Sequence, residues 1–168
     1  MPEIDNSYIK DSDDRDQLLK LCEHELVNRK VLKVRWLRFC DDLALDVESD
    51  TAERVWLSLN YVHWDLLDEN SNERVASSHE EFETFRAPAE RLAGARIAKL
   101  DIRSDEGLSL TVYFSSGQYL RMEPCEDSED DGIMFPGWEL FCSDGNVIVV
   151  KMQQGKWKFQ SRKAPYSP

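Results

Sequence analysis

The sequence has no hydrophobic run that approaches the roughly 18 apolar residues of a membrane-spanning helix. Its first residues, MPEIDNSYIKDSDDRDQ, are polar and acidic, and they lack the basic start and apolar core of a signal peptide. Both absences argue against a membrane or secreted protein. We therefore expect the chain to act in the cytoplasm.

Closely spaced cysteines are also missing. None of the four cysteines forms a CxxC pair, and they are Cys22, Cys40, Cys125 and Cys142. A structural zinc site takes closely spaced pairs of ligands, so the sequence predicts no zinc site. In a reducing compartment these side chains are expected to be free, mostly buried thiols.

Catalytic motifs are absent as well. No serine lies in a GxSxG turn, no glycine-rich loop suits a phosphate or a dinucleotide, and the three histidines form no HxH, HExxH or HxxxH pattern. The pattern assigns His63 to a strand beside Trp64, and His79 to an exposed helix start. A Cys–His pair formed only by folding stays open. We predict no enzyme, no catalytic residues and no cofactor.

Basic residues are scarce relative to acidic ones. The chain has 21 lysines and arginines against 33 aspartates and glutamates, a formal net charge of -12. Such a surplus repels nucleic acid and anionic membranes, and it favours a partner with a basic surface because opposite fields speed association. The alternative is that the charge only keeps the protein dissolved.

The hydrophobic residues that are present follow two periods. At 41% of 168 residues, with 32% charged, they suit one globular domain, residues 1–168. A spacing of three and four residues predicts a helix over about 13–28, with Ser12 or Asp11 as its cap. The apolar stripe of this helix is Leu18, Leu19, Cys22 and Leu26.

Alternation of apolar and polar residues predicts strands over most of the remaining chain. In RVWLSLNYVHW the residues predicted to share one face are Val55, Leu57, Leu59 and Tyr61. The polar middle, about 68–94, predicts two short helices, the first with a capping box of Ser77 with Glu80 or Ser78 with Glu81.

The predicted fold is therefore α+β, a predominantly antiparallel β-sheet with an N-terminal helix and short central helices. A weak internal sequence similarity suggests a duplication with two similar halves, 12–68 and 88–160. LVNRKVLKV aligns with LAGARIAKL, and WDL aligns with WEL. Chance similarity between amphipathic strands is the alternative.

One segment is unusually acidic. CEDSEDDGIMFPGWE packs five carboxylates into six positions, Glu126 to Asp131. From Asp127 the spacing approximates the start of an EF-hand loop, but position twelve is Trp138 and Pro136 interrupts the loop, so we predict no calcium site. The alternatives are a solvated loop and a surface for a basic partner.

The predicted partner-binding surface combines this loop with an apolar anchor. Its acidic residues are Glu123, Glu126, Asp127, Glu129, Asp130 and Asp131. Phe135 or Trp56 would be the anchor, since an exposed tryptophan is a common interface residue. Trp56 lies on the opposite face of its strand from Val55 and Leu57, and its alternative is burial under a helix.

Small size, acidity and the run LAGARIAKLDI…LSLTVYFSSGQYLRM…GWELFCSDGNVIVV, between Leu92 and Val150, resemble the immunity proteins of bacterial polymorphic toxin systems. These include contact-dependent inhibition and type VI secretion immunity proteins. The resemblance implies tight one-to-one binding to a toxin domain, here a nuclease, which the immunity protein neutralises. It transfers no site residues, since immunity proteins share a task rather than one motif.

Two other classes of function stay open. One is a phage-type anti-defence or regulatory protein that imitates the charge of DNA. The other is a small-molecule-binding domain, or an unrecognised enzyme, with a pocket between sheet and helices.

Overall fold

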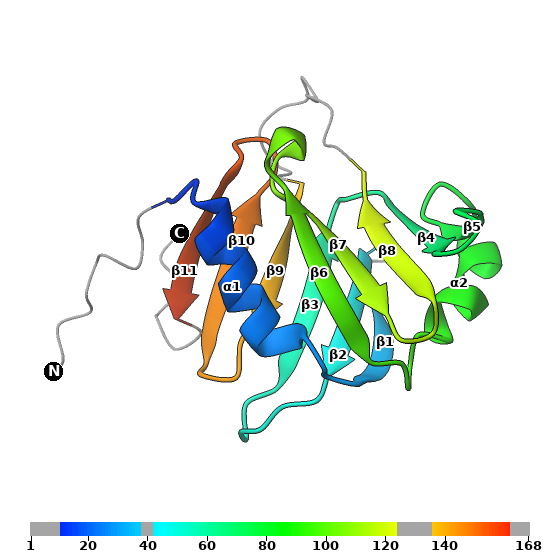
Figure 1. Ribbon diagram of the computed structural model, residues 1–168, viewed down its shortest axis with the longest axis horizontal. Coiled ribbons are helices and arrows are strands. Elements are labelled where there is room, and N and C mark those ends of the chain that lie inside the picture. The colour runs from blue at the N-terminus through cyan, green and yellow to red at the C-terminus, as the bar shows by residue number, and fades with distance from the viewer. Residues whose placement is uncertain (1–10, 38–41, 124–135, 162–168) are drawn as a thin grey trace, which may run out of the picture.

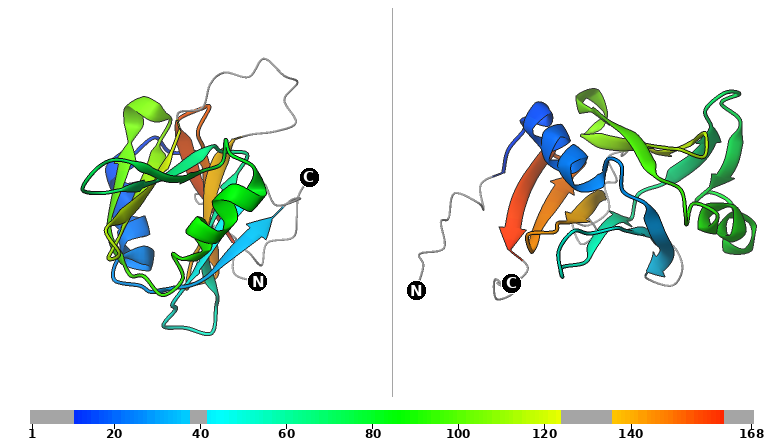
Figure 2. Two further views of the ribbon diagram at one scale, coloured as in Figure 1. Left: turned by 90° about the vertical axis from the view of Figure 1, so that its right-hand side faces the viewer. Right: turned by 60° about the horizontal axis from the view of Figure 1, so that its bottom comes forward.

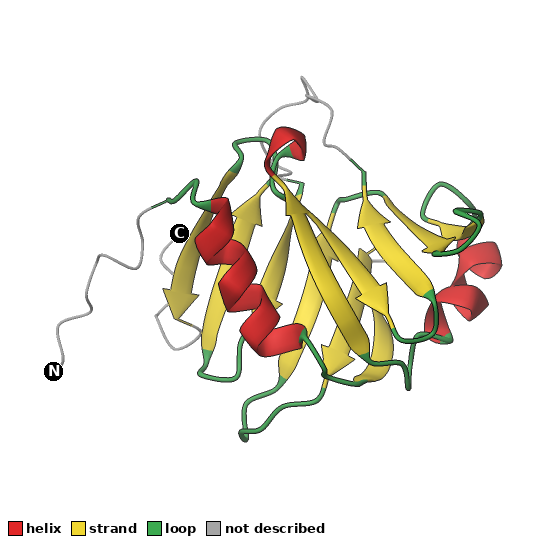
Figure 3. Ribbon diagram, in the orientation of Figure 1, coloured by secondary structure: helices red, strands yellow, loops and turns green. Residues whose placement is uncertain are grey.

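The computed structural model of the chain describes residues 11–37, 42–123 and 136–161. These residues form two α-helices and eleven strands in two antiparallel sheets, with about 18% helix and 49% strand (Figure 3). The predicted α+β class dominated by antiparallel sheet is confirmed. No helix in these three segments is long and apolar enough to cross a membrane.

One sheet has six strands in the order β1-β2-β3-β9-β10-β11. Their bounds are β1 Val31–Leu37, β2 Asp42–Val47, β3 Val55–Asn60, β9 Gly137–Phe141, β10 Asn146–Lys151 and β11 Lys156–Ser161. The central β3–β9 pair joins strands that are far apart in the sequence, with Leu57 opposite Leu140.

The other sheet has five strands in the order β5-β4-β8-β7-β6. Their bounds are β4 Trp64–Asp68, β5 Arg74–Ser77, β6 Ile97–Arg103, β7 Ser109–Phe114 and β8 Gln118–Met122. Here too a central pair, β4–β8, joins distant segments, with Leu66 opposite Leu120. Each sheet therefore contains strands from both predicted halves, which meet at one central pair, and the duplication stays a prediction.

The core lies between the two sheets, which form two layers in Figure 1 and Figure 2. The inward residues of most strands follow the predicted period of two, but a bulge interrupts it in β1 and in β6. Both Trp64 and Trp138 are fully buried. Burying one large apolar side chain contributes about 1.5–3 kcal/mol. The alternating residues of the sequence thus supply most of the stability of the fold.

Helix α1 (Arg15–Leu26) covers the part of the six-stranded sheet that the second sheet leaves open (Figure 1). It packs beside β6, and the indole N–H of Trp157 in β11 donates to the carbonyl oxygen of Asp14 at 3.0 Å. The predicted cap was wrong: the side chain of Asp14 accepts from the backbone N–H of Gln17 at 3.1 Å. A cap two or three residues later shortens the helix at its start.

Helix α2 (Phe82–Glu90) lies between the β4–β5 hairpin and β1 (Figure 2, left). The sequence predicted two short helices with a capping box, whereas the structure has one helix that contains Pro88, and Glu81 at its start makes no side-chain cap bond. The reason is that the hydroxyl oxygens of both serines accept other hydrogen bonds. The Oγ of Ser77 accepts from the backbone N–H of His79, and the Oγ of Ser78 accepts from that of Trp64.

The strand predicted across 54–64 is broken. Strand β3 ends at Asn60, Tyr61 has a left-handed φ of 54°, and β4 begins at Trp64 in the other sheet. The chain thus turns at Tyr61 as it passes from one sheet to the other. Tyr61 therefore leaves the apolar face of Val55 and is 44% exposed, and His63 lies in the connection rather than in a strand.

Candidate functional site

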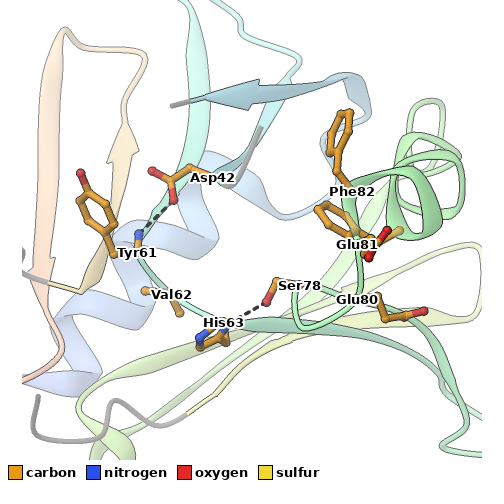
Figure 4. A pocket seen from close by; sticks show the side chains of 9 residues that line it. Asp42, Tyr61, Val62, His63, Ser78, Glu80, Glu81 and Phe82 are labelled. Carbon is orange, nitrogen blue, oxygen red and sulfur yellow. Dashed lines mark hydrogen bonds between the residues drawn. The ribbon is translucent and has the colours of Figure 1, made fainter. Parts of the chain in front are cut away.

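A cavity of about 490 Å³ opens where the chain crosses between the sheets (Figure 4). Three segments line it: the start of β2, the β3–β4 connection, and the β5–α2 connection with α2 itself. The lining residues are Asp42, Tyr61, Val62, His63, Ser78, Glu80, Glu81, Phe82 and Phe85. Of these described lining residues three are carboxylates, and none is lysine or arginine.

Asp42 fixes one wall of the cavity. It is the first residue of β2, only 4% exposed, and its Oδ1 accepts a hydrogen bond of 3.1 Å from the backbone N–H of Tyr61. Figure 4 shows Asp42 and Tyr61 on one side of the cavity, with Phe82 and Glu81 on the other. Carboxylates and aromatic rings thus lie on both sides.

His63 lines the cavity between these walls, and its ring stacks on that of His79. The rings of His63 and His79 have centroids 4.1 Å apart and are inclined by 18°. His63 Nδ1 lies 3.2 Å from the Oγ of Ser78, and His79 Nε2 lies 2.9 Å from both carboxylate oxygens of Glu123. This row of side chains connects Glu123 to the cavity.

The histidine pair was missed by the sequence analysis, which sought motifs of closely spaced histidines. His63 directly precedes β4, and His79 follows β5 by two residues. Because β4 and β5 form an antiparallel hairpin, with Asp65 opposite Ser77, its open end brings the two histidines together. The length of the β4–β5 hairpin could have predicted this pairing. That prediction would have required us to recognise that the strand breaks at Tyr61. The predicted exposure of His79 is correct.

Two carboxylates at the cavity have no lysine or arginine partner among the described residues. Glu80 and Glu81 are exposed and form no ion pair within the described segments. Many arginines elsewhere are offset locally by a carboxylate at 2.6 to 3.7 Å. They are Arg15, Arg29, Arg35, Arg54, Arg74, Arg86, Arg96, Arg103 and Arg121. Among the described residues, the negative charge of Glu80 and Glu81 is therefore not offset by an ion pair with lysine or arginine.

Most of the predicted acidic surface lies outside the described residues. This holds for Glu126, Asp127, Glu129, Asp130, Asp131 and Phe135. Glu123 is described: it directly follows β8, its side chain is 31% exposed, and its carboxylate binds His79. A role of these residues in partner binding stays a prediction.

Trp56 lies on the outer face of the six-stranded sheet, opposite to the core, as the alternation predicted. Its ring stacks on Phe141 with centroids 3.8 Å apart, and the guanidinium carbons of Arg35 and Arg54 each lie 5.4 Å from its centroid. Both arginines also bind Asp46, at 2.8 and 3.0 Å. Neighbours in its own sheet thus half-bury Trp56, and its use as an anchor stays a prediction.

Among the residues that the structure describes, no thiol lines the cavity and no cluster of metal ligands is found. Cys22 and Cys142 are free and buried, as predicted, and burial raises the pKa of Cys22 well above its ordinary value of 9.0. Cys40 and Cys125 lie outside the described residues. Within the described segments no group of three or more histidines, cysteines, aspartates or glutamates is arranged to hold a metal ion.

Comparisons of the chain with models of known families, with curated proteins and with solved structures gave no match. The residues that line the cavity favour a ligand of positive charge. Carboxylates accept charge-assisted hydrogen bonds from cations, and aromatic rings attract cations over their faces. An anionic ligand such as a nucleotide would be repelled by the same groups.

Proposed function

We propose that this chain binds a basic protein and neutralises it, in the way that immunity proteins neutralise toxin domains. The observation that carries the proposal is the pair Glu80 and Glu81, exposed at a cavity whose described lining has no lysine or arginine. Such carboxylates attract an approaching cationic surface and form new ion pairs without breaking existing ones.

A nuclease toxin is a suitable partner because an enzyme that acts on nucleic acid presents cationic groups to phosphates. In the sequence the acidic run begins three residues after Glu123, whose carboxylate binds His79. We expect the charge of Glu80 and Glu81 and that of the run to act on one partner.

The test is protection of cells from a toxin. The basic domain encoded directly upstream of this chain is produced in a susceptible host, and growth is measured with and without the chain. Full protection by the unaltered chain is expected, with weaker protection by a Glu80→Lys/Glu81→Lys variant. A toxic neighbour that the chain fails to counter, or a neighbouring gene that encodes no toxin, would contradict the proposal.

A matched control variant is Glu69→Lys/Glu73→Lys. Both residues are exposed, form no ion pair within the described segments, and lie around the β4–β5 turn, at the other end of this hairpin from the cavity. The change in net charge equals that of the cavity variant. Equal loss of protection by both variants would show that only total charge matters.

The cavity favours a second candidate, a small cationic ligand. Its volume of about 490 Å³ falls within the roughly 300–1,000 Å³ typical of small-molecule sites. A thermal-shift screen with amines, nucleotides and metal ions tests it. A rise in Tm with an amine, in a chain that gives no protection, would favour this candidate.

A further inference from the structure

We infer that the cavity receives one arginine side chain of the basic partner, an inference that rests on the proposed function and specifies its contact. Carboxylates on a surface would by themselves be solvated. The independent observation is the cavity of about 490 Å³, bounded by aromatic side chains as well as by acidic ones. It has room for one long side chain.

The arrangement of the walls suits a guanidinium group. Asp42 and Tyr61 lie on one side of the cavity, and Phe82 and Glu81 lie on the other (Figure 4). A guanidinium is planar, donates five hydrogen bonds within its plane, and stacks on aromatic faces, so it can satisfy carboxylates and rings together. The ammonium of lysine is a strongly hydrated point charge without a stacking face, and it matches these walls less well.

The chain itself holds arginine in this manner on its outer sheet face. Arg35 and Arg54 each lie over the ring of Trp56 while binding the carboxylate of Asp46. At the cavity the aromatic and acidic groups are present, but the described lining supplies no arginine. An arginine of the partner would complete the same combination.

The experiment titrates the ¹⁵N-labelled chain with N-acetyl-arginine amide and follows backbone amides by NMR. Saturable shifts at Tyr61, His63 and Ser78 are expected. The citrulline analogue, which has the same shape but no charge, should give none, and the lysine analogue should bind more weakly. Equal shifts with citrulline, or no saturable shift at tens of millimolar arginine analogue, would overturn the inference.

Variants test which groups hold the probe. Glu80→Gln/Glu81→Gln should weaken binding of the arginine analogue about fivefold, the scale of two partly exposed ion pairs. Glu69→Gln/Glu73→Gln should leave it unchanged. Equal weakening in both variants would show binding to overall charge and would contradict a specific cavity.

The two proposals fail in different ways. If the arginine analogue does not bind while Glu80→Lys/Glu81→Lys still loses protection, the proposed function stands and the arginine contact is wrong. If the analogue binds but this variant protects as well as the unaltered chain, the cavity serves a small cation, and the arginine contact is again overturned.

Discussion

The backbone N–H of Tyr61 donates a hydrogen bond of 3.1 Å to the Oδ1 of Asp42, linking the point where the chain leaves the six-stranded sheet to the first residue of β2. Tyr61 has a φ of 54°, a left-handed conformation that costs a residue with a side chain about 1–2 kcal/mol. A buried carboxylate thus stabilises a strained backbone at the cavity, and an exposed aromatic ring is held at its edge.

The strain at Tyr61 is measurable by comparing two truncations. Tyr61→Gly and Tyr61→Ala both remove the aromatic ring, but only glycine adopts a positive φ without steric cost. We expect the glycine variant to have the larger free energy of unfolding, by about 1 kcal/mol, in urea denaturation. Equal stabilities would show that this residue is not strained.

The role of Asp42 is tested by changing its acceptor. Asp42→Ala leaves the N–H of Tyr61 without this acceptor and should lower the free energy of unfolding by about 1–3 kcal/mol. Asp42→Asn keeps an oxygen that accepts the bond and should retain part of that stability. If the alanine variant is as stable as the asparagine variant in urea, the bond does not hold the turn.

A buried carboxylate on the five-stranded sheet predicts coupling between two arginines. The side chain of Asp65 is 2% exposed, with Arg74 Nε at 3.3 Å from its Oδ1 and Arg121 Nη2 at 3.7 Å from its Oδ2. The contact with Arg74 is an ion pair rather than a hydrogen bond, since this Oδ1 has no hydrogen-bond partner among the described residues.

Because either arginine alone can offset the charge of Asp65, Arg74→Ala and Arg121→Ala should each be mildly destabilising. The double variant leaves the buried carboxylate without a cation and should lose more than the sum of both, by at least about 1 kcal/mol. A double-mutant cycle in urea measures this coupling. Additive losses would mean that the two contacts act independently.

Cys22 predicts a loss of stability in alkaline solution. Burial, and secondarily Cys142, raises its pKa in the folded chain well above the ordinary 9.0. The stabilising contribution is complete below the unfolded pKa and is lost as the pH rises toward the folded pKa, because only the unfolded chain then releases the proton. Between pH 9 and pH 10 the loss is about 1 kcal/mol.

The measurement compares the free energy of unfolding against pH for the unaltered chain and Cys22→Ala. The alanine variant should be less stable overall, yet it should decline less steeply above pH 9. Iodoacetamide at pH 9 should modify Cys22 only on unfolding. Parallel curves and rapid labelling of the folded chain would contradict a buried, protonated thiol.

Alternation and helical spacing predicted the class of fold because they record which side of each element is buried. Leu18, Cys22 and Leu26 are buried on α1, and Val55, Leu57 and Leu59 face the core from β3. Register between distant strands leaves no such local pattern, so the β3–β9 and β4–β8 pairs could not be predicted.

The cavity could not be predicted because it depends on the turn at Tyr61, which the alternation of apolar and polar residues does not reveal. Tyr61 continues the apolar period of β3, yet the chain turns there, and a pattern of hydrophobicity does not report a positive φ. With the turn unrecognised, His63 was assigned to a strand and its stacking on His79 was missed. Glu80 and Glu81 were assigned to a capping box and were not recognised as lining one cavity with Asp42.

The most direct test of the account is the rate at which the chain associates with its basic toxin partner, measured by stopped flow at low and high salt. At low salt, Glu80→Lys/Glu81→Lys should slow association by at least about tenfold relative to Glu69→Lys/Glu73→Lys, and high salt should narrow this difference. If both variants associate equally fast at low salt, the cavity carboxylates do not receive the partner.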